Sequence, residues 1–213
     1  MGALIKVLIA DDHAIVRRGL KEILARELPD ITCGEAKNAE EILAQVQAQA
    51  WDLMILDLGL PGRSGVDVLG DLQNLNANLR ILVLSMYPED QYGRRVLKAG
   101  AWGYMNKESA PDELIKAIRS LLAGRHYLSP RLAEQLASDL HGHGDVAVLD
   151  TLSDRELEIL KLIAMGRTLS QVANELHLAI TTVSTYRTRL LEKTKKATTA
   201  DLIRYALENH LIN

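Results

Sequence analysis

The chain has 213 residues, 47% of them hydrophobic and 25% charged, which suffices for one large domain or two ordinary ones. The formal net charge of −3 is uneven, because residues 151–213 carry nine Lys and Arg against seven Asp and Glu, whereas residues 1–150 carry 16 against 21. A single cysteine, Cys33, and the lack of any apolar run of roughly 18 residues exclude an internal disulfide and a membrane span, so we expect a cytoplasmic protein without membrane contacts.

The first 123 residues alternate short apolar runs with amphipathic segments. Runs of strand length lie at Leu4–Ala10, Ile31–Ala36, Leu53–Leu56, Ile81–Leu84 and Gly103–Met105. Helical periodicity fills the intervals at Ala14–Arg26, Ala39–Ala48, Gly65–Asn74, Glu89–Ala99 and Pro111–Ala123. Because parallel strands need crossover connections, this order predicts a five-stranded parallel sheet, doubly wound and flavodoxin-like, over residues 1–123. In such sheets the ligand site lies at the carboxyl ends of the strands.

The alternation stops after residue 123, and we expect residues 124–148 to form a linker with one helix. Ser129 as N-cap and Pro130 in the first turn predict a helix that ends near Leu140. The stretch His141-Gly-His143-Gly follows. Its two histidines are compatible with a metal site, but its glycine content favours a tether.

Residues 149–213 have the pattern of an all-α domain with four helices. The sequences Ser153-Asp-Arg-Glu156 and Thr168-Leu-Ser-Gln171 are capping boxes that predict two helix starts, and Gly166 ends the first helix. After a turn at His177-Leu178, further helices are expected at Ile180–Lys193 and Thr199–Asn209. Two short helices joined by a tight turn and followed by a longer basic helix are typical of a helix-turn-helix.

Carboxylates, a hydroxyl and a lysine follow four of the predicted strands where each strand ends. Asp11 and Asp12 follow the first strand, Asp57 the third, Ser85 the fourth and Lys107 the fifth. Since these strand ends share one edge of the sheet, we expect the five side chains to converge. Carboxylates hold a hard cation such as Mg²⁺, while a lysine and a hydroxyl meet phosphoryl oxygens. The set predicts transfer of a phosphoryl group to one aspartate.

With these residues in this order, residues 4–123 resemble the receiver domain of two-component response regulators. The resemblance implies that Asp11, Asp12, Asp57 and the backbone carbonyl of Gly59 hold Mg²⁺. It implies that Asp57, within "LDLGLPGRSG", accepts a phosphoryl group from a sensor histidine kinase. It further implies that Ser85 moves toward this group, that Tyr104 is an aromatic switch, and that Lys107 is the lysine of the site.

Two positions depart from the pattern of that family. Residue 86 is usually small, whereas here it is Met86, and a bulky side chain beside the phosphorylation site would hinder water. We therefore expect slow autodephosphorylation. Glu108 replaces a frequent proline after Lys107, and a cis bond before a residue other than proline costs roughly 3 kcal/mol, so none is assumed.

The third helix of the tail has one apolar and one polar side. Val183, Leu190 and Leu191, with Tyr186 at the margin, are expected to pack on the preceding helices. The polar side offers hydroxyl and guanidinium groups for phosphates and base edges, from Thr181, Thr182, Ser184, Thr185, Arg187, Thr188 and Arg189. Between residues 177 and 200 five Lys and Arg face Glu192 alone, whereas a solvated amphipathic helix, the alternative, predicts mixed charge.

The segment "LSDRELEILKLIAMGRTLSQVANELHLAITTVSTYRTRLLEKT" resembles the LuxR-type output domain, so the whole chain is similar to NarL/FixJ-family response regulators. The resemblance places Ser184, Thr185 and Thr188 at bases, and Thr182, Arg187, Arg189 and Lys193 at the DNA backbone. Ser184 and Tyr186 replace a frequent Lys and His, and Ala179 replaces the usual Ser cap, so the base preference does not transfer. Leu202, Ile203, Ala206 and Leu207 on the last helix match the dimer surface of that family, although core packing explains them equally well.

The predicted function is that of a transcription regulator controlled by phosphorylation, and not that of an enzyme. Its expected partners are double-stranded DNA with paired half-sites, a sensor histidine kinase and, once phosphorylated, a second copy of the chain. One alternative is a constitutive DNA binder with a pseudo-receiver, which would lack part of the acidic site. The other is an aspartate-dependent phosphohydrolase, which needs a second acid where this chain has Gly59.

Overall fold

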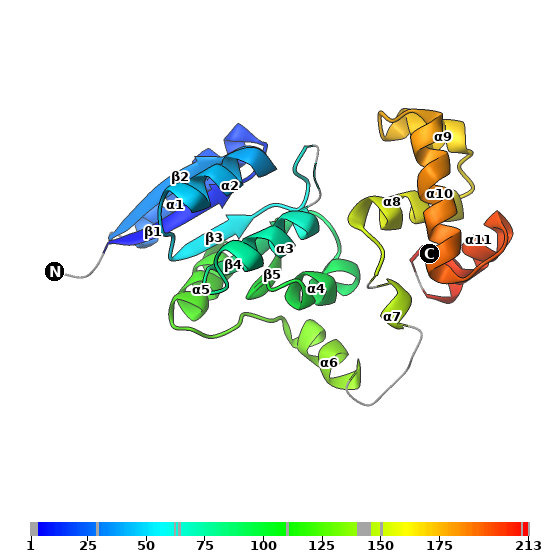
Figure 1. Cartoon of the computed structure of the whole chain (residues 1–213). Helices are drawn as coiled ribbons and strands as arrows, with labels where there is room; N and C mark the ends of the chain where they lie inside the picture. Colours follow the sequence, from blue (N-terminus) through cyan, green and yellow to red (C-terminus); the bar gives the residue numbers. More distant parts are fainter. Residues whose placement is uncertain are drawn as a thin grey trace. The chain divides into compact units, whose positions relative to one another are not determined.

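The computed structural model describes residues 4–212 except 29, 62, 64, 110, 140–145, 150 and 210, and these form two compact units, residues 1–141 and 142–213. The first unit holds a five-stranded parallel sheet with the strand order β2-β1-β3-β4-β5 (Figure 1). The strands are β1 (Ile5–Ala10), β2 (Ile31–Ala36), β3 (Leu53–Leu56), β4 (Arg80–Ser85) and β5 (Gly103–Asn106). The helices between and after them are α1 (Ala14–Glu27), α2 (Ala39–Ala48), α3 (Gly65–Leu75), α4 (Glu89–Lys98), α5 (Pro111–Leu122) and α6 (Pro130–Asp139).

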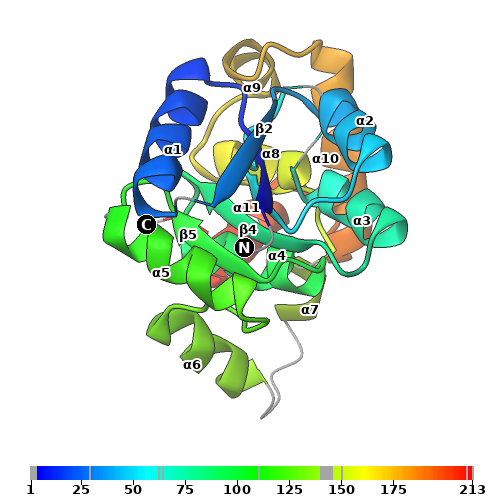
Figure 2. The ribbon, with the colours of Figure 1, turned by 90° about the vertical axis from the view of Figure 1, so that its left-hand side faces the viewer.

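The predicted doubly wound α/β fold is confirmed, and each predicted strand or helix is present with ends that shift by one residue at most. Helices cover both faces of the sheet, with α1 and α5 on one side and α2 and α3 on the other (Figure 2). The central strands β3 and β4 are buried on both faces, which explains why they are continuous apolar runs, whereas the edge strand β2 is only partly buried. On the α1 and α5 side, Val7, Ile55 and Leu82 pack with Leu24 and Ile118 in one core.

Helix α6, predicted as part of the linker, packs on α4 within the first unit. Leu132 is fully buried, and a Cβ added at Gly93 would lie 2.9 Å from its Cδ2 atom, so the glycine allows the close approach. Ser129 caps α6 by accepting from the Leu132 amide at 3.1 Å and donates to Glu89 of α4 at 2.6 Å. The predicted His141-Gly-His143-Gly tether lies outside the described residues, and the predicted boundaries at 123/124 and 148/149 remain predictions.

The second unit consists of helices, and the predicted four-helix domain is confirmed. They are α7 (Val146–Leu149), α8 (Asp154–Ala164), α9 (Leu169–Glu175), α10 (Ile180–Thr194) and α11 (Thr199–Glu208). Helix α7 was not predicted, because four residues are too few for a periodic pattern. Val183 and Leu190 of α10 are fully buried as predicted, and so are Leu202 and Ala206 of α11, so core packing explains the latter two.

Side chains cap the helices of the second unit at their starts. Both predicted capping boxes are confirmed, at Ser153 with Glu156 and at Thr168 with Gln171. A third box joins Thr198 to Asp201 at the start of α11. Gly166 follows α8 with a φ of +81°, a left-handed conformation that glycine adopts without strain. None of the helices described here is long and apolar enough to cross a membrane.

Candidate functional site

The order of the strands brings the predicted acidic site together. β1, β3, β4 and β5 are neighbours, and the chain reverses its direction of winding between β1 and β3. Backbone hydrogen bonds continue the ladder into the site, because the Asp57 amide donates to Ala10 at 2.8 Å and the Lys107 amide donates to Ser85 at 2.9 Å. The sheet therefore fixes the backbone positions of Asp57 and Lys107, which follow its strands.

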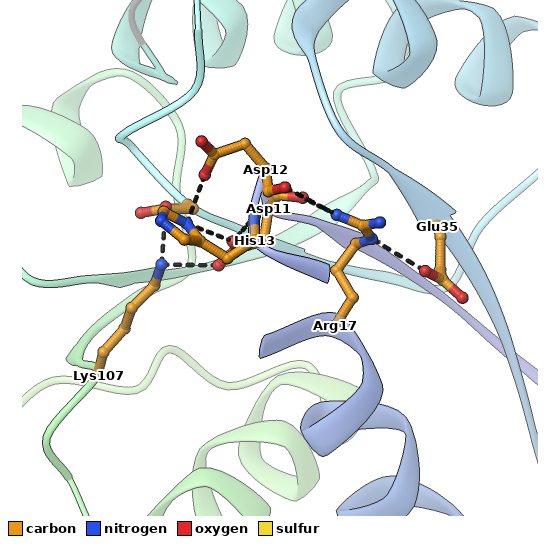
Figure 3. Close-up of polar contacts among 7 residues, drawn as sticks. Asp11, Asp12, His13, Arg17, Glu35 and Lys107 are labelled. Atoms are coloured by element: carbon orange, nitrogen blue, oxygen red, sulfur yellow. Dashed lines mark hydrogen bonds and ion pairs between the residues drawn. The ribbon is translucent and has the colours of Figure 1, made fainter. Parts of the chain in front are cut away.

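Lys107 lies between two buried carboxylates. Its Nζ atom donates to Asp11 Oδ2 at 2.6 Å, as Figure 3 shows, and to Asp57 Oδ2 at 2.7 Å. The side chains of Asp11 and Asp57 are only 3% and 6% exposed. Charges so far from water are stable only when they are paired, so the three groups form one electrostatic unit.

Lys107 carries its positive charge at neutral pH. Burial acts to lower its pKa, but the hydrogen bonds to Asp11 and Asp57 and the charges of these carboxylates outweigh burial and raise the pKa above 10.5. The lysine therefore offers a permanent cation and further N–H groups to an anion that arrives at Asp57.

The acidic cluster fits a divalent cation in charge and in spacing. Ligand atoms of Asp11, Asp12, His13 and Asp57 lie within 4.8 Å of one another. Three carboxylates against Lys107 leave two negative charges in excess, which one divalent cation would balance. His13 was not predicted, although it directly follows the acidic pair; its Nδ1 atom lies 2.6 Å from Asp12 Oδ1. A Cβ added at Gly59 would lie 3.3 Å from Asp57 Oδ2, so this backbone borders the cluster.

Ser85 and Tyr104 both contact the segment that follows β4. Ser85 is 1% exposed, and its hydroxyl accepts from the Tyr87 amide at 3.3 Å. Tyr104, also 1% exposed, donates from its hydroxyl to the Tyr87 carbonyl at 2.5 Å. The Tyr87 ring stacks on Tyr92 of α4, with 4.7 Å between the centroids. A continuous set of contacts thus joins the end of β4 to helix α4.

Met86 directly follows Ser85, the last residue of β4, and is 60% exposed. We predict that Met86→Ala speeds loss of the phosphoryl group from Asp57 several-fold, because a smaller side chain gives water easier access to the phosphorus. The rate is measured by following the phosphorylated chain after the phosphodonor is removed. A variant that loses phosphate no faster than the parent contradicts the prediction.

The described part of the chain contains no cis peptide bond, so Lys107 and Glu108 are joined in trans.

Helix α10 exposes most of the polar residues that were predicted to contact DNA. Those classed as exposed are Thr181, Ser184, Thr185, Thr188, Arg189 and Lys193, while Thr182 and Arg187 are partly buried. Thr185 and Thr188 donate to carbonyls four residues earlier in the helix, which leaves their oxygen atoms as acceptors. The guanidinium group of Arg189 lies 5.9 Å from the Tyr186 ring centroid, beside a shallow hollow on the same face.

Two of the predicted DNA contacts also bind other residues of their own unit. Arg187 Nε donates to Thr199 Oγ1 of α11 at 2.8 Å. Lys193 Nζ donates to the Thr151 carbonyl at 2.9 Å and to Glu156 Oε2 at 2.6 Å. Glu156 is only 2% exposed, so the ion pair gives Lys193 a structural role that the sequence did not reveal. DNA contacts by these residues remain predictions.

Comparisons with known proteins agree with this architecture. Residues 7–119 match the response regulator receiver domain, and residues 150–206 match the luxR family of bacterial regulatory proteins. The chain is 31% identical to the response regulator UvrY of Escherichia coli K12, covering 99% of this chain and 97% of that one. It is 36% identical to the transcriptional activator protein ExaE of Pseudomonas putida, covering 97% of each.

Among solved structures, the chain is similar to RcsB from Salmonella enterica serovar Typhimurium bound to promoter rprA in the presence of the phosphomimetic BeF3−. The identity is 27%, the TM-score is 0.60, and the match covers 94% of this chain and 98% of that one. Both domains and nearly the full length are thus shared with such proteins. The chain belongs to the response regulators of the NarL/FixJ family, in which a receiver domain precedes a LuxR-type helix-turn-helix domain.

Proposed function

We propose that Asp57 accepts a phosphoryl group from a sensor histidine kinase and that this event controls DNA binding by α10 and dimerisation of the chain. The observation that carries the proposal is the cluster in which Lys107 bridges Asp11 and Asp57 at the carboxyl edge of the sheet. A constitutive binder with a pseudo-receiver has no need for such a buried, charged cluster. Because the regulator must share a compartment with DNA, a cytoplasmic location belongs to the proposal.

The transfer step uses one oxygen of the Asp57 carboxylate as the nucleophile. This oxygen attacks the phosphorus of a phosphohistidine in the kinase, so that an O–P bond forms while the P–N bond breaks. The imidazole nitrogen keeps the electron pair of the broken bond and takes a proton from solvent. Lys107, already in contact with Asp57, meets a phosphoryl oxygen, and the buried Ser85 hydroxyl supplies a second donor.

We propose Mg²⁺ as the cation of this site, held by Asp11, Asp12, Asp57 and the carbonyl of Gly59. Mg²⁺ held by these residues would neutralise charge on the transferred phosphoryl group. The chain's own residues orient the nucleophile: Lys107 holds Asp57 Oδ2, and the Asp57 amide is fixed by its bond to Ala10. Glycine at residue 59 leaves no second acid there to activate water, so the phosphohydrolase alternative lacks its catalytic group.

The signal leaves the site through the segment that follows β4. A Ser85 hydroxyl that turns toward the phosphoryl group gives up its bond to the Tyr87 amide, and Tyr104 holds the Tyr87 carbonyl. The Tyr87 ring then transmits the change to Tyr92 of α4. A switch from about 1:99 to 99:1 requires that the phosphoryl group prefer the active form by roughly 5.5 kcal/mol.

The experiment is footprinting of the full chain on genomic fragments, with and without a small phosphodonor and Mg²⁺. We expect protected paired half-sites, about one helical turn apart, that appear or strengthen with the phosphodonor. The Asp57→Ala variant should show the same protection in both conditions. Identical protection of the parent in all conditions would reject control by phosphorylation, and no protection at all would reject the role of α10.

A separate experiment tests whether Arg187 contacts a DNA phosphate, as we propose. Replacing Arg187 by alanine removes one cation that would face the DNA backbone. The logarithm of the DNA association constant falls linearly with the logarithm of the salt concentration, and the magnitude of this slope should decrease by about 0.9. The exposed Arg204 of α11 is a control, because its loss removes the same charge from a helix outside the predicted contact surface. If both variants keep the slope of the parent, Arg187 does not contact phosphate.

A further inference from the structure

Arg17 of α1 binds the backbone that carries the acidic pair. Its NH1 atom donates to the Asp11 carbonyl at 2.7 Å and to the Asp12 carbonyl at 3.2 Å, a contact that Figure 3 shows. The guanidinium group therefore holds the two peptide units at the end of β1, and not the carboxylates themselves. The acid side chains stay available for Lys107 and for a cation.

Glu35, from the neighbouring strand β2, anchors Arg17 from the other side. Arg17 Nε donates to Glu35 Oε2 at 2.9 Å, and Lys21 Nζ donates to Glu35 Oε1 at 2.7 Å. Hydrogen bonds from Lys21 and Arg17 hold the pKa of Glu35 below its ordinary value, so the anchor is charged at neutral pH. The Arg17 side chain is only 14% exposed, which makes its position well defined.

We propose that Arg17 is a positioning residue of the phosphorylation site, which orients Asp11 and Asp12 for the divalent cation and depends on Glu35 for its own placement. This inference rests on the function proposed above. The peptide planes of residues 11 and 12 set the direction in which their side chains leave the backbone. A planar guanidinium group that bridges two carbonyls and a carboxylate restrains these planes better than a lysine, which has one donor atom.

The sign of the effect separates positioning from simple electrostatics. Loss of a positive charge beside an acidic cluster, taken alone, strengthens the binding of a cation. Loss of a group that orients the ligands weakens binding, and residues behind the metal ligands typically contribute 10- to 100-fold to metal affinity. If Arg17 positions the ligands, the Arg17→Ala variant binds Mg²⁺ more weakly than the parent. If only its charge matters, the variant binds Mg²⁺ more tightly.

The test is calorimetric titration of the full chain with Mg²⁺. We expect the Kd of Arg17→Ala to rise about tenfold, with partial recovery in Arg17→Lys. Glu35→Ala should also weaken binding, because the unanchored Arg17 then competes for the carboxylates, whereas Glu35→Gln keeps an acceptor and should bind like the parent. Arg18→Ala is the matched control, since it removes an exposed arginine next in the chain and should leave Kd unchanged or lower.

A Kd of Arg17→Ala equal to or below that of Arg18→Ala overturns the inference, whatever happens to the melting temperature. If Arg17→Ala does not fold, Arg17→Lys and Glu35→Ala decide by the same criterion. A parent chain that takes up no Mg²⁺ contradicts the proposed metal site itself, and the positioning role with it. A parent that binds Mg²⁺ beside variants that bind equally well contradicts only the role of Arg17.

Discussion

Asp57→Ala will take up no phosphoryl group from either a histidine kinase or a small phosphodonor. The variant lacks the carboxylate oxygen that attacks phosphorus, and neither Asp11 nor Asp12 replaces it, because both oxygens of Asp11 accept hydrogen bonds, from the His13 amide and from Lys107, and Asp12 lies at the exposed rim. The expected effect is complete loss, not a reduced rate. Intact-mass measurement of the chain after incubation with phosphodonor and Mg²⁺ gives the number of phosphoryl groups directly.

Asp67→Ala is the control for this result, since it removes an exposed carboxylate from the first turn of α3. It should be phosphorylated to the same extent as the parent, with one group per chain. Phosphoryl uptake by Asp57→Ala at the parent's level would place the acceptor elsewhere in the chain. Peptide mapping would then identify that residue.

Lys193→Ala will lower the free energy of unfolding of the second unit by about 2 kcal/mol. The change removes the cation from Glu156, which is 2% exposed and also accepts from the Ser153 amide at 2.6 Å. Glu156 keeps the hydrogen bond from the Ser153 amide when it loses Lys193. The loss of stability should therefore be smaller than for a buried carboxylate that has no partner left. Amide hydrogen exchange of α8 and α10 in the full chain measures the loss, and Arg204→Ala, which removes an exposed cation, should cause little.

The effect of Lys193→Ala should depend on pH. Burial acts to raise the pKa of Glu156, but the hydrogen bonds from Lys193 and Ser153 outweigh it and lower the pKa below its ordinary value of 4.5. A lowered carboxyl pKa adds stability that is present above pH 4.5 and is lost as pH falls through the folded-state pKa. The difference between parent and variant should therefore shrink in that acid window. A constant difference from neutral pH to well below this window would contradict the ion pair.

The fold follows from local sequence patterns, which is why the predicted strands and helices agree with the observed ones to within about one residue at each end. Buried parallel strands are continuous apolar runs, and the capping boxes at Ser153 and Thr168 are made by residues three apart. The box at Thr198 was missed because the third residue of the helix is Asp201, where the motif usually has Glu or Gln. Helix α7 is too short to leave a pattern.

The candidate site could be predicted only as far as topology determines it. Asp11, Asp57 and Lys107 meet because each follows a parallel strand, so their order in the chain was enough. Arg17 and Lys193 contact partners through side chains that cross between elements, at Glu35 and Glu156. Periodicity places Lys193 on a polar face of α10, but only the packing of α8 against α10 reveals the buried acid beneath it.

The most direct test of the central claim compares the affinity of one preparation of the chain for one footprinted DNA fragment in two states, phosphorylated and unphosphorylated. Fluorescence anisotropy is recorded while the chain is phosphorylated, and again after the phosphoryl group has been lost. Control by Asp57 predicts that Kd changes by about 5- to 150-fold between the two states, the usual range for coupling between two sites. Equal affinities in both states, with phosphorylation verified by mass, would contradict it.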